Sequence, residues 1–231
     1  MARREVGRAD QALVAAAREA LQARAGLRFV VGAAGTGKTT VCAAIGERLR
    51  IDVLDMDARI YGSWHGRFDP VRHPASHAWS AAADPLAWQL AMEPAAYLAF
   101  QEASTAEALD LLGEELRDED PDRAFLVDGG FGSAGTLARI VPPDRIVCLA
   151  LPPADQAGVW TATEDRRAFL DMVAGVTAVA DPVGRFLALD AHLAGAMVRD
   201  SEASGILVLE RRPTDGIAPF AERVARALGL G

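Results

Sequence analysis

Lysine is nearly absent from this chain of 231 residues. Lysine and arginine number 24 together, and a single one of them, Lys38, is a lysine. Arginine supplies every other permanently charged basic side chain, so Lys38 marks a position where the bulkier guanidinium does not serve. A general compositional bias toward arginine would also make lysine rare, so the scarcity alone assigns no role to Lys38.

Basic residues are also fewer than acidic residues. The chain has 32 acidic residues, and its formal net charge at pH 7 is −8. General nucleic-acid binding needs a basic surface, and attraction to an anionic membrane surface needs one too. The charge balance therefore argues against nucleic-acid and membrane partners.

Long apolar runs and cysteines are the remaining absences. No run approaches the roughly 18 apolar residues of a membrane span, and residues 1–10 hold no apolar segment of the signal-peptide type. Cys42 and Cys148 are too few for a disulfide framework and are expected to be buried thiols in a reducing compartment. These absences predict a cytoplasmic protein.

Short apolar segments alternate with helical patterns along the chain. Strands are predicted at 27–31, 51–54, 124–127, 145–151 and 206–209, and helices at 8–25, 38–50, 84–100, 104–117, 136–140, 163–173, 182–201 and 217–228. Residues 61–83 are predicted to be irregular, and Pro94 is expected to break the helix at 84–100. The alternation predicts an α/β fold in which a five-stranded parallel sheet has helices on both faces.

The strongest motif is a phosphate loop. Residues 32–39 fit the pattern G-x-x-x-x-G-K-[ST] between a predicted strand and a predicted helix, a context that disfavours a chance glycine loop. Its glycines allow backbone N–H groups to surround phosphates, Lys38 would bridge the β- and γ-phosphates, and Thr39 would ligate Mg²⁺. The motif predicts the P-loop NTPase fold, with ATP and Mg²⁺ as cofactors. The expected nucleotide-binding residues are Gly32, Ala33, Ala34, Gly35, Thr36, Gly37, Lys38, Thr39 and Thr40.

Carboxylates follow two of the predicted strands. Asp128 ends residues 124–127 in the manner of a Walker B aspartate, which holds Mg²⁺ directly or through water. Asp55 and Asp57 follow the second strand, and alternation in an extended chain would point both to one side. One of this pair would lie near the metal, with Asp55 the candidate ligand, and the other would accept a proton. Loop aspartates or a helix cap at Asp57 are the alternatives.

These motifs resemble those of P-loop small-molecule kinases. The phosphate loop, Asp-x-Asp at 55–57 and Asp-Gly-Gly at 128–130 are similar to shikimate kinase-like and gluconate kinase-like enzymes, and residues 54–64 resemble uridine kinase-like proteins. The resemblance implies that Asp55 or Asp57 is the catalytic base. It also implies an arginine-bearing lid at about 152–180, with Arg166 and Arg167 as candidates, and a nucleotide contact from Arg211. Residues 151–163 contain no arginine, a departure that leaves a solvated helix start as the alternative for Arg166 and Arg167.

The acceptor pocket is expected in a helical insertion at 58–120, within one kinase domain at 1–231. Aromatic, imidazole and guanidinium groups concentrate there, and Arg67 or Arg72 would meet an acidic group on the acceptor. Packing of the tryptophans in the core is the alternative. The candidate acceptor-binding residues are Asp57, Tyr61, Trp64, His65, Arg67 and Arg72, with Gly129 and Gly130 where the backbone turns; a plain tight turn is equally compatible with these glycines.

The expected function is ATP-dependent transfer of a phosphoryl group to a hydroxyl of a small molecule. A nucleoside or nucleotide kinase, a regulatory P-loop ATPase and a binding module without turnover remain open alternatives. The guanine-reading pattern Asn-Lys-x-Asp is excluded, because the single lysine is in the phosphate loop.

Overall fold

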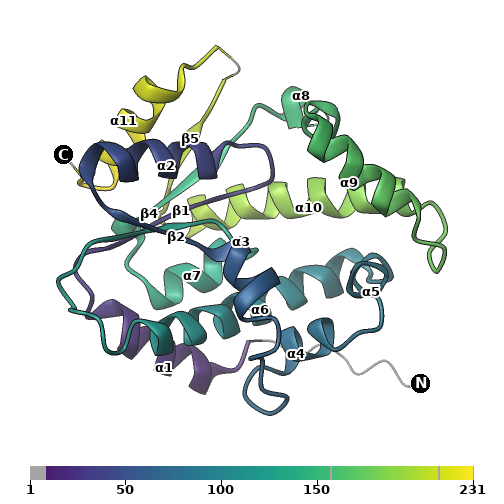
Figure 1. Cartoon of the computed structure of the whole chain (residues 1–231), viewed down its shortest axis with the longest axis horizontal. Coiled ribbons are helices and arrows are strands. Elements are labelled where there is room, and N and C mark those ends of the chain that lie inside the picture. The colour runs from purple at the N-terminus through teal and green to yellow at the C-terminus, as the bar shows by residue number, and fades with distance from the viewer. Residues whose placement is uncertain (1–8, 157, 213, 231) are drawn as a thin grey trace.

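The computed structural model describes residues 9–156, 158–212 and 214–230. Its centre is a parallel sheet with the strand order β2-β3-β1-β4-β5 (Figure 1). The strands are β1 Leu27–Gly32, β2 Asp52–Asp55, β3 Phe125–Asp128, β4 Ile146–Ala150 and β5 Leu207–Glu210. The predicted five-stranded parallel sheet is confirmed.

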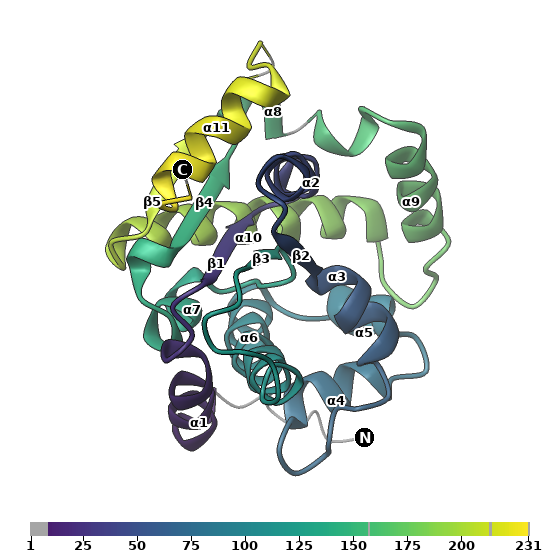
Figure 2. The same cartoon turned by 60° about the vertical axis from the view of Figure 1, so that its left-hand side comes forward.

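Helices cover both faces of the sheet, as the apolar strands require (Figures 1 and 2). One core cluster joins the sheet to α2 and α11, and a larger one joins the opposite face to α1, α6, α7 and α10. The α-helices are α1 Gln11–Gln22, α2 Lys38–Leu49, α3 Met56–Ala58, α4 Pro74–Ser80, α5 Pro85–Leu90, α6 Pro94–Glu115, α7 Ala134–Ile140, α8 Pro153–Gln156, α9 Glu164–Ala174, α10 Pro182–Ala203 and α11 Ile217–Ala227. A π-helix η1 spans Arg59–Ser63, and the 3₁₀ turns are η2 Pro143–Arg145 and η3 Val159–Thr161. Within the described ranges, none of these helices is long and apolar enough to cross a membrane.

The strand register brings the polar residues to one edge of the sheet. Asp128 lies opposite Asp55 on β2 and opposite Val30 on β1, two residues before Gly32. Gly32 itself pairs with Leu149 of β4. Since the carboxyl ends of parallel strands meet at this edge, the phosphate loop and both carboxylates open into the same crevice.

Three sequence predictions of local structure are wrong. The two helices predicted at 84–100 and 104–117 are divided at the wrong place, because α5 ends at Leu90 and α6 then runs unbroken from Pro94 to Glu115; the predicted break at Pro94 is confirmed. The segment 61–83 is not wholly irregular, since it contains α4. Residues 55–57 do not continue as an extended chain, because the short helix α3 begins at Met56. The expected start of the first helix at Arg8 lies outside the described residues.

A long-range cap explains why α4 forms. Pro74 is tolerated as its first residue because the first turn leaves backbone N–H groups unpaired in any case. Two of these groups, on Ala75 and Ser76, donate at 2.9 and 2.7 Å to the buried carboxylate of Glu107 in α6. A contact across 31 or 32 residues is invisible to local periodicity.

Candidate active site

The phosphate loop, residues 32–39, connects β1 to α2. Gly35 and Gly37 have φ values of 80° and 84°, in the left-handed region that favours glycine. Among the described residues, no side chain caps the first turn of α2, so its N–H groups are available to phosphate oxygens and the positive end of the helix dipole faces them. The buried Thr36 hydroxyl donates to the Ala33 carbonyl at 3.0 Å and closes the loop on itself.

The chain has a P-loop NTPase fold. Its strand order, its loop between β1 and α2 and its carboxylate at the end of β3 together define that architecture. The phosphate site of such a fold is the loop itself, and the remaining polar groups are placed relative to it.

Lys38 lies folded along the loop. Its Nζ donates to the Ala33 carbonyl at 3.0 Å. Burial lowers the pKa of Lys38, and the charges of Asp57 and Asp128 act in the opposite direction. A phosphate oxygen is a stronger partner for an ammonium than a backbone carbonyl, so Lys38 is poised to exchange one for the other.

Asp128 and Thr39 offer oxygen ligands for a divalent cation. Burial raises the pKa of Asp128, and the Thr39 hydroxyl beside it acts in the opposite direction. The buried Oδ1 of Asp128 has no hydrogen-bond partner among the described residues. The same part of the chain holds no cluster of three His, Cys, Asp or Glu side chains placed to bind a metal. These residues fit Mg²⁺, which takes one or two protein ligands and completes its shell with phosphate and water.

Asp57 approaches Lys38 across Gly129. A Cβ on Gly129 would be 3.1 Å from Lys38 Cε and 3.9 Å from Asp57 Oδ2, so both side chains lie over this glycine. Asp57 keeps contact with solvent, yet the surrounding protein reduces its hydration and raises its pKa. Asp55 and Asp128 add to that increase, while Lys38 opposes it.

Asp55 has a partly structural role. Its carboxylate accepts from the Ala58 N–H at 2.9 Å and caps the short helix α3. The cap therefore falls on Asp55 and not on Asp57, which leaves the Asp57 carboxylate the freer of the two. Asp55 still lies opposite Asp128 in the strand register, and its charge helps to raise the pKa of Asp128.

The lid region approaches the phosphate loop through Val159 and Arg166. A Cβ on Gly35 would be 2.6 Å from both Val159 methyl groups and 3.0 Å from Arg166 Nη1. Arg166 is held there by the Val159 carbonyl at 3.0 Å and by the ring of Trp160. Arg167, in contrast, donates to the Thr161 carbonyl at 2.7 Å. The structure thus separates the two candidates, which the sequence did not.

Arg211 lies against the other end of the loop. Its backbone N–H extends the sheet by donating to the Ala150 carbonyl at 2.9 Å, and its guanidinium packs directly on Gly37. Its buried Nε has no hydrogen-bond partner among the described residues. Arg211 therefore has unused hydrogen-bonding capacity beside the phosphate loop, as a nucleotide contact would require.

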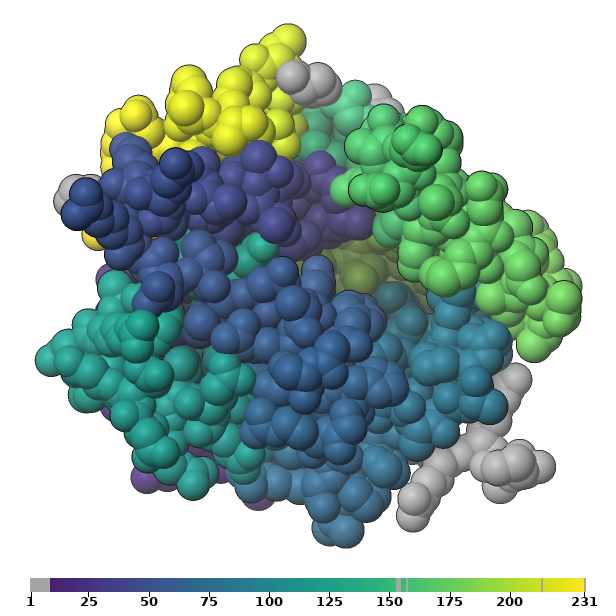
Figure 3. All heavy atoms as spheres, viewed as in Figure 1, coloured from purple at the N-terminus to yellow at the C-terminus, as the bar shows by residue number. Residues whose placement is uncertain are grey.

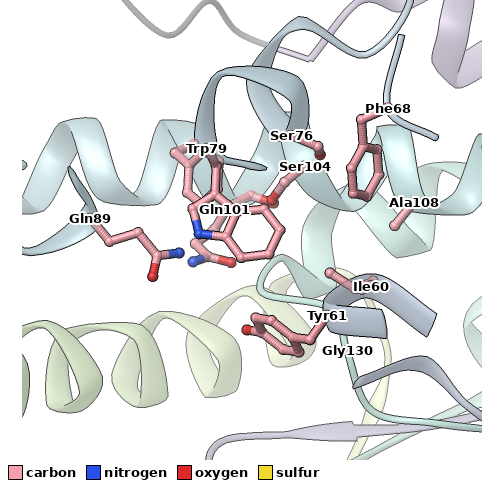
Figure 4. A pocket seen from close by; sticks show the side chains of 11 residues that line it. Ile60, Tyr61, Phe68, Ser76, Trp79, Gln89, Gln101, Ser104, Ala108 and Gly130 are labelled. Carbon is pink, nitrogen blue, oxygen red and sulfur yellow. The ribbon is translucent and has the colours of Figure 1, made fainter. Parts of the chain in front are cut away.

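A pocket of about 410 Å³, part of it open to solvent, lies next to the segment that carries Asp57, although Asp57 itself is not one of its lining residues (Figure 4). Ile60 and Tyr61 from η1 form one wall with Gly130, and Trp79 from α4 forms another. The space-filling view shows the surface hollowed between the lid region, residues 152–180, and the insertion (Figure 3). The ring of Tyr61 is 63% exposed at the mouth of the pocket.

Of the eight expected acceptor-binding residues, Tyr61 and Gly130 line this pocket, and the other six do not: Asp57, Trp64, His65, Arg67, Arg72 and Gly129. Trp64 is fully buried, and its Nε1 donates to Glu115 at 2.9 Å, so it packs the insertion onto the core. Arg67 pairs with Glu114 at 3.8 Å, and Arg72 is paired with carboxylates of α6. His65 packs edge-on against Trp79, with ring centroids 5.3 Å apart, and with Arg67 it lines a separate, more open hollow.

Sequence reasoning missed the polar residues that do line the pocket. Gln89 of α5 and both Gln101 and Ser104 of α6 contribute side chains to its walls. They occupy ordinary helical positions, and no local pattern distinguishes a glutamine that faces a pocket from one that faces solvent. Val159, which covers Gly35, was missed for the same reason.

Gly130 cannot accept a side chain without a shift in the structure. Its φ is 74°, and a Cβ there would collide with the Cβ of Met56. We expect Gly130→Ala to lower the free energy of unfolding by roughly 1–3 kcal/mol, measured by chemical denaturation. Gly66→Ala is the matched control, because its Cβ would meet nothing within 4 Å, and a change within about 0.5 kcal/mol is expected. Equal effects would contradict the steric argument.

Comparisons with known proteins give structural neighbours only. A shikimate kinase from Acinetobacter baumannii, solved in complex with shikimate, is 17% identical, with 87% of this chain and 91% of that chain covered and a TM-score of 0.47. TT1252 from Thermus thermophilus is 20% identical, with 87% and 96% covered and a TM-score of 0.45. No protein-family model matches the chain, and no curated protein sequence matches it.

Proposed function

We propose that this protein is an ATP-dependent phosphotransferase that phosphorylates a hydroxyl group of a small molecule. The observation that carries the proposal is the meeting of Lys38 and Asp57 over Gly129, between the phosphate loop and the pocket. A cation for the transferring phosphoryl group thus lies beside a carboxylate that can accept a proton from the acceptor.

Different residues of the site act on the phosphoryl group and on the proton. The bond from the γ-phosphorus to the β-bridging oxygen breaks, and a bond from that phosphorus to the acceptor oxygen forms, giving ADP and a phosphate monoester. The hydroxyl proton passes to the Asp57 carboxylate. Lys38 and the N–H groups of the loop stabilise negative charge on the phosphoryl oxygens. Arg166 approaches the same oxygens from the lid, where its planar fork is suited to bind two of them.

Thr39 and Asp128 would hold Mg²⁺, with Asp55 as a further candidate ligand. When bound, the ion supplies neutralisation of phosphate charge. In the protein alone, burial and the charges of neighbouring carboxylates raise the pKa values of Asp57 and Asp128, which is the electrostatic situation that a cation relieves.

A coupled assay of ADP formation tests the proposal. Purified protein with ATP and Mg²⁺ is offered a panel of sugars, cyclitols, hydroxy acids and nucleosides, and products are identified by mass spectrometry as phosphate monoesters. We expect at least one acceptor to raise ADP formation well above the rate without acceptor. ATP hydrolysis that no acceptor increases would favour the regulatory ATPase, and tight ATP binding without turnover would favour the binding module.

Arg166 and Arg167 provide a matched pair of variants in the lid. We expect Arg166→Ala to lower kcat by roughly 10²-fold or more, since an arginine that stabilises phosphoryl charge contributes on that scale. Arg167→Ala should change kcat by less than about threefold, because Arg166 and not Arg167 lies against Gly35 of the phosphate loop. The measurement is steady-state turnover with the best acceptor, and a larger loss in Arg167→Ala would contradict the assignment.

A further inference from the structure

The hydrogen-bonding side chains in the walls of the pocket near Asp57 are all uncharged. Among the residues that the structure describes, no charged side chain lines it. Figure 4 shows the amides of Gln89 and Gln101 and the indole nitrogen of Trp79 directed toward the same space. The Tyr61 hydroxyl adds a fourth neutral group at the mouth.

Cations near the pocket are engaged elsewhere. Arg72 contacts Asp110 and Glu114 at 2.8 and 2.7 Å, and Arg59 contacts Glu115 at 2.8 Å. Arg185 of α10, which approaches α5, donates to the Leu90 carbonyl at 3.1 Å and pairs with Glu93. An acidic group in the pocket would therefore lose water without gaining a cation, which is strongly unfavourable.

The chemistry of the walls selects an uncharged partner. An amide presents both donors and an acceptor, so Gln89 and Gln101 match hydroxyl groups, which also do both. Tyr61 and Trp79 meet edge to face, with ring centroids 5.4 Å apart and an interplanar angle of 83°, and form an aromatic corner. The apolar face of a hydroxylated ring can pack in such a corner while its hydroxyls reach the amides.

We propose that the acceptor is an uncharged ring compound with several hydroxyl groups. This inference rests on the proposed function, and it departs from the sequence expectation that Arg67 or Arg72 meets an acidic group. A free carboxylate or phosphate on the acceptor opposes binding, since Asp57 nearby adds its negative charge and the cation closest to it, Lys38, faces the phosphate loop and does not line the pocket. The reacting hydroxyl is the one that reaches Asp57 when the ring occupies the corner.

Matched compounds that differ only in charge test the proposal. The pairs are glucose and glucuronate, uridine and uridine monophosphate, and methyl shikimate and shikimate. The neutral cyclitol myo-inositol is tested in addition, to show whether a neutral ring that is not a sugar is also accepted. We expect the neutral member of the productive pair to have at least tenfold higher kcat/KM. Preference for the charged member would overturn the inference.

Equilibrium binding separates this inference from the proposed function. Titration of the protein with both members of each pair, followed by tryptophan fluorescence or calorimetry, reports binding without turnover. Preferential binding of a neutral ring without phosphorylation would support the pocket assignment and count against the kinase. Binding of the acids, or of no compound in any pair, would overturn the inference whether or not ATP is hydrolysed.

Two variants add a charge test. Gln89→Arg places a cation in the wall and should shift the ratio of acidic to neutral kcat/KM by at least tenfold toward the acid. Arg67→Gln removes the arginine that pairs with Glu114 outside the pocket, and the same ratio should stay within about twofold. A selective loss of acidic acceptors in Arg67→Gln would show that Arg67 reads the acceptor, against the proposal.

Discussion

Replacement of Lys38 by alanine is expected to lower kcat/KM for phosphoryl transfer by about 10³-fold or more. Lys38 is the single lysine of the chain, and its ammonium lies inside the loop, where it donates to the Ala33 carbonyl. No arginine that the structure describes occupies the same space between the loop and Gly129. Its charge is therefore not replaceable by a neighbour.

The folded state should tolerate the loss of Lys38. Burial lowers the pKa of Lys38, which means that the protein without nucleotide disfavours the ammonium. We expect the thermal midpoint of Lys38→Ala to be close to that of the parent, so that lost activity cannot be attributed to unfolding. Circular dichroism and steady-state turnover, measured on the same preparation, check both statements.

Lys38→Arg is the informative control. It keeps the positive charge but replaces a compact ammonium by a wider, planar guanidinium in the narrow space where Lys38 lies close over Gly129. We expect a loss of activity comparable with that of the alanine variant. Full activity in Lys38→Arg would mean that charge alone suffices, and full activity in Lys38→Ala would remove the loop from the reaction.

The elements that were predicted correctly are those whose signals lie close together in the sequence. Residues 27–49 contain an apolar strand, a glycine loop and a helix in immediate succession, and the structure reproduces that order within a residue or two. The carboxylate at Asp128 likewise follows its strand directly. Parallel pairing then brings it opposite Asp55, because sheet geometry leaves little choice once the strands are known.

The acceptor side was not predictable in the same way. Trp64 looked like a pocket residue because of its neighbours in sequence, whereas its burial depends on Glu115, 51 residues away. Arg72 was expected to be free to bind an acceptor, but in the structure Asp110 and Glu114 of α6 form ion pairs with it. Contacts between distant helices decide which side chains remain free, and a single sequence does not contain them in readable form.

Asp57→Asn is expected to lower kcat by roughly 10²- to 10⁴-fold while ATP binding is retained. Asparagine matches the shape of aspartate but cannot accept the hydroxyl proton. Asp55→Asn is the matched control, since asparagine also caps helices well and the Ala58 N–H would keep its partner. Its effect on kcat should be much smaller, and the reverse order of the two losses would make Asp55 the base.

The pH dependence provides an independent check on Asp57. The reaction needs its ionised form, and burial together with Asp55 and Asp128 raises its pKa against the opposing effect of Lys38. The acid limb of kcat/KM should therefore lie above the ordinary range of aspartate and disappear from the residual activity of Asp57→Asn. A limb within the ordinary range would contradict the environment assigned to Asp57.

The same pKa shift predicts a gain in stability from the inactive variant. A pKa raised by folding means that the folded state favours the protonated carboxyl, so ionised Asp57 destabilises the nucleotide-free protein. Asp57→Asn removes that charge, and its thermal midpoint should exceed the parent's at pH values above the folded pKa. The excess should shrink as the pH falls through the folded pKa toward that of the unfolded chain, because the parent then carries a neutral side chain too. A variant that is less stable at neutral pH would show that attraction to Lys38 outweighs burial and repulsion by Asp55 and Asp128.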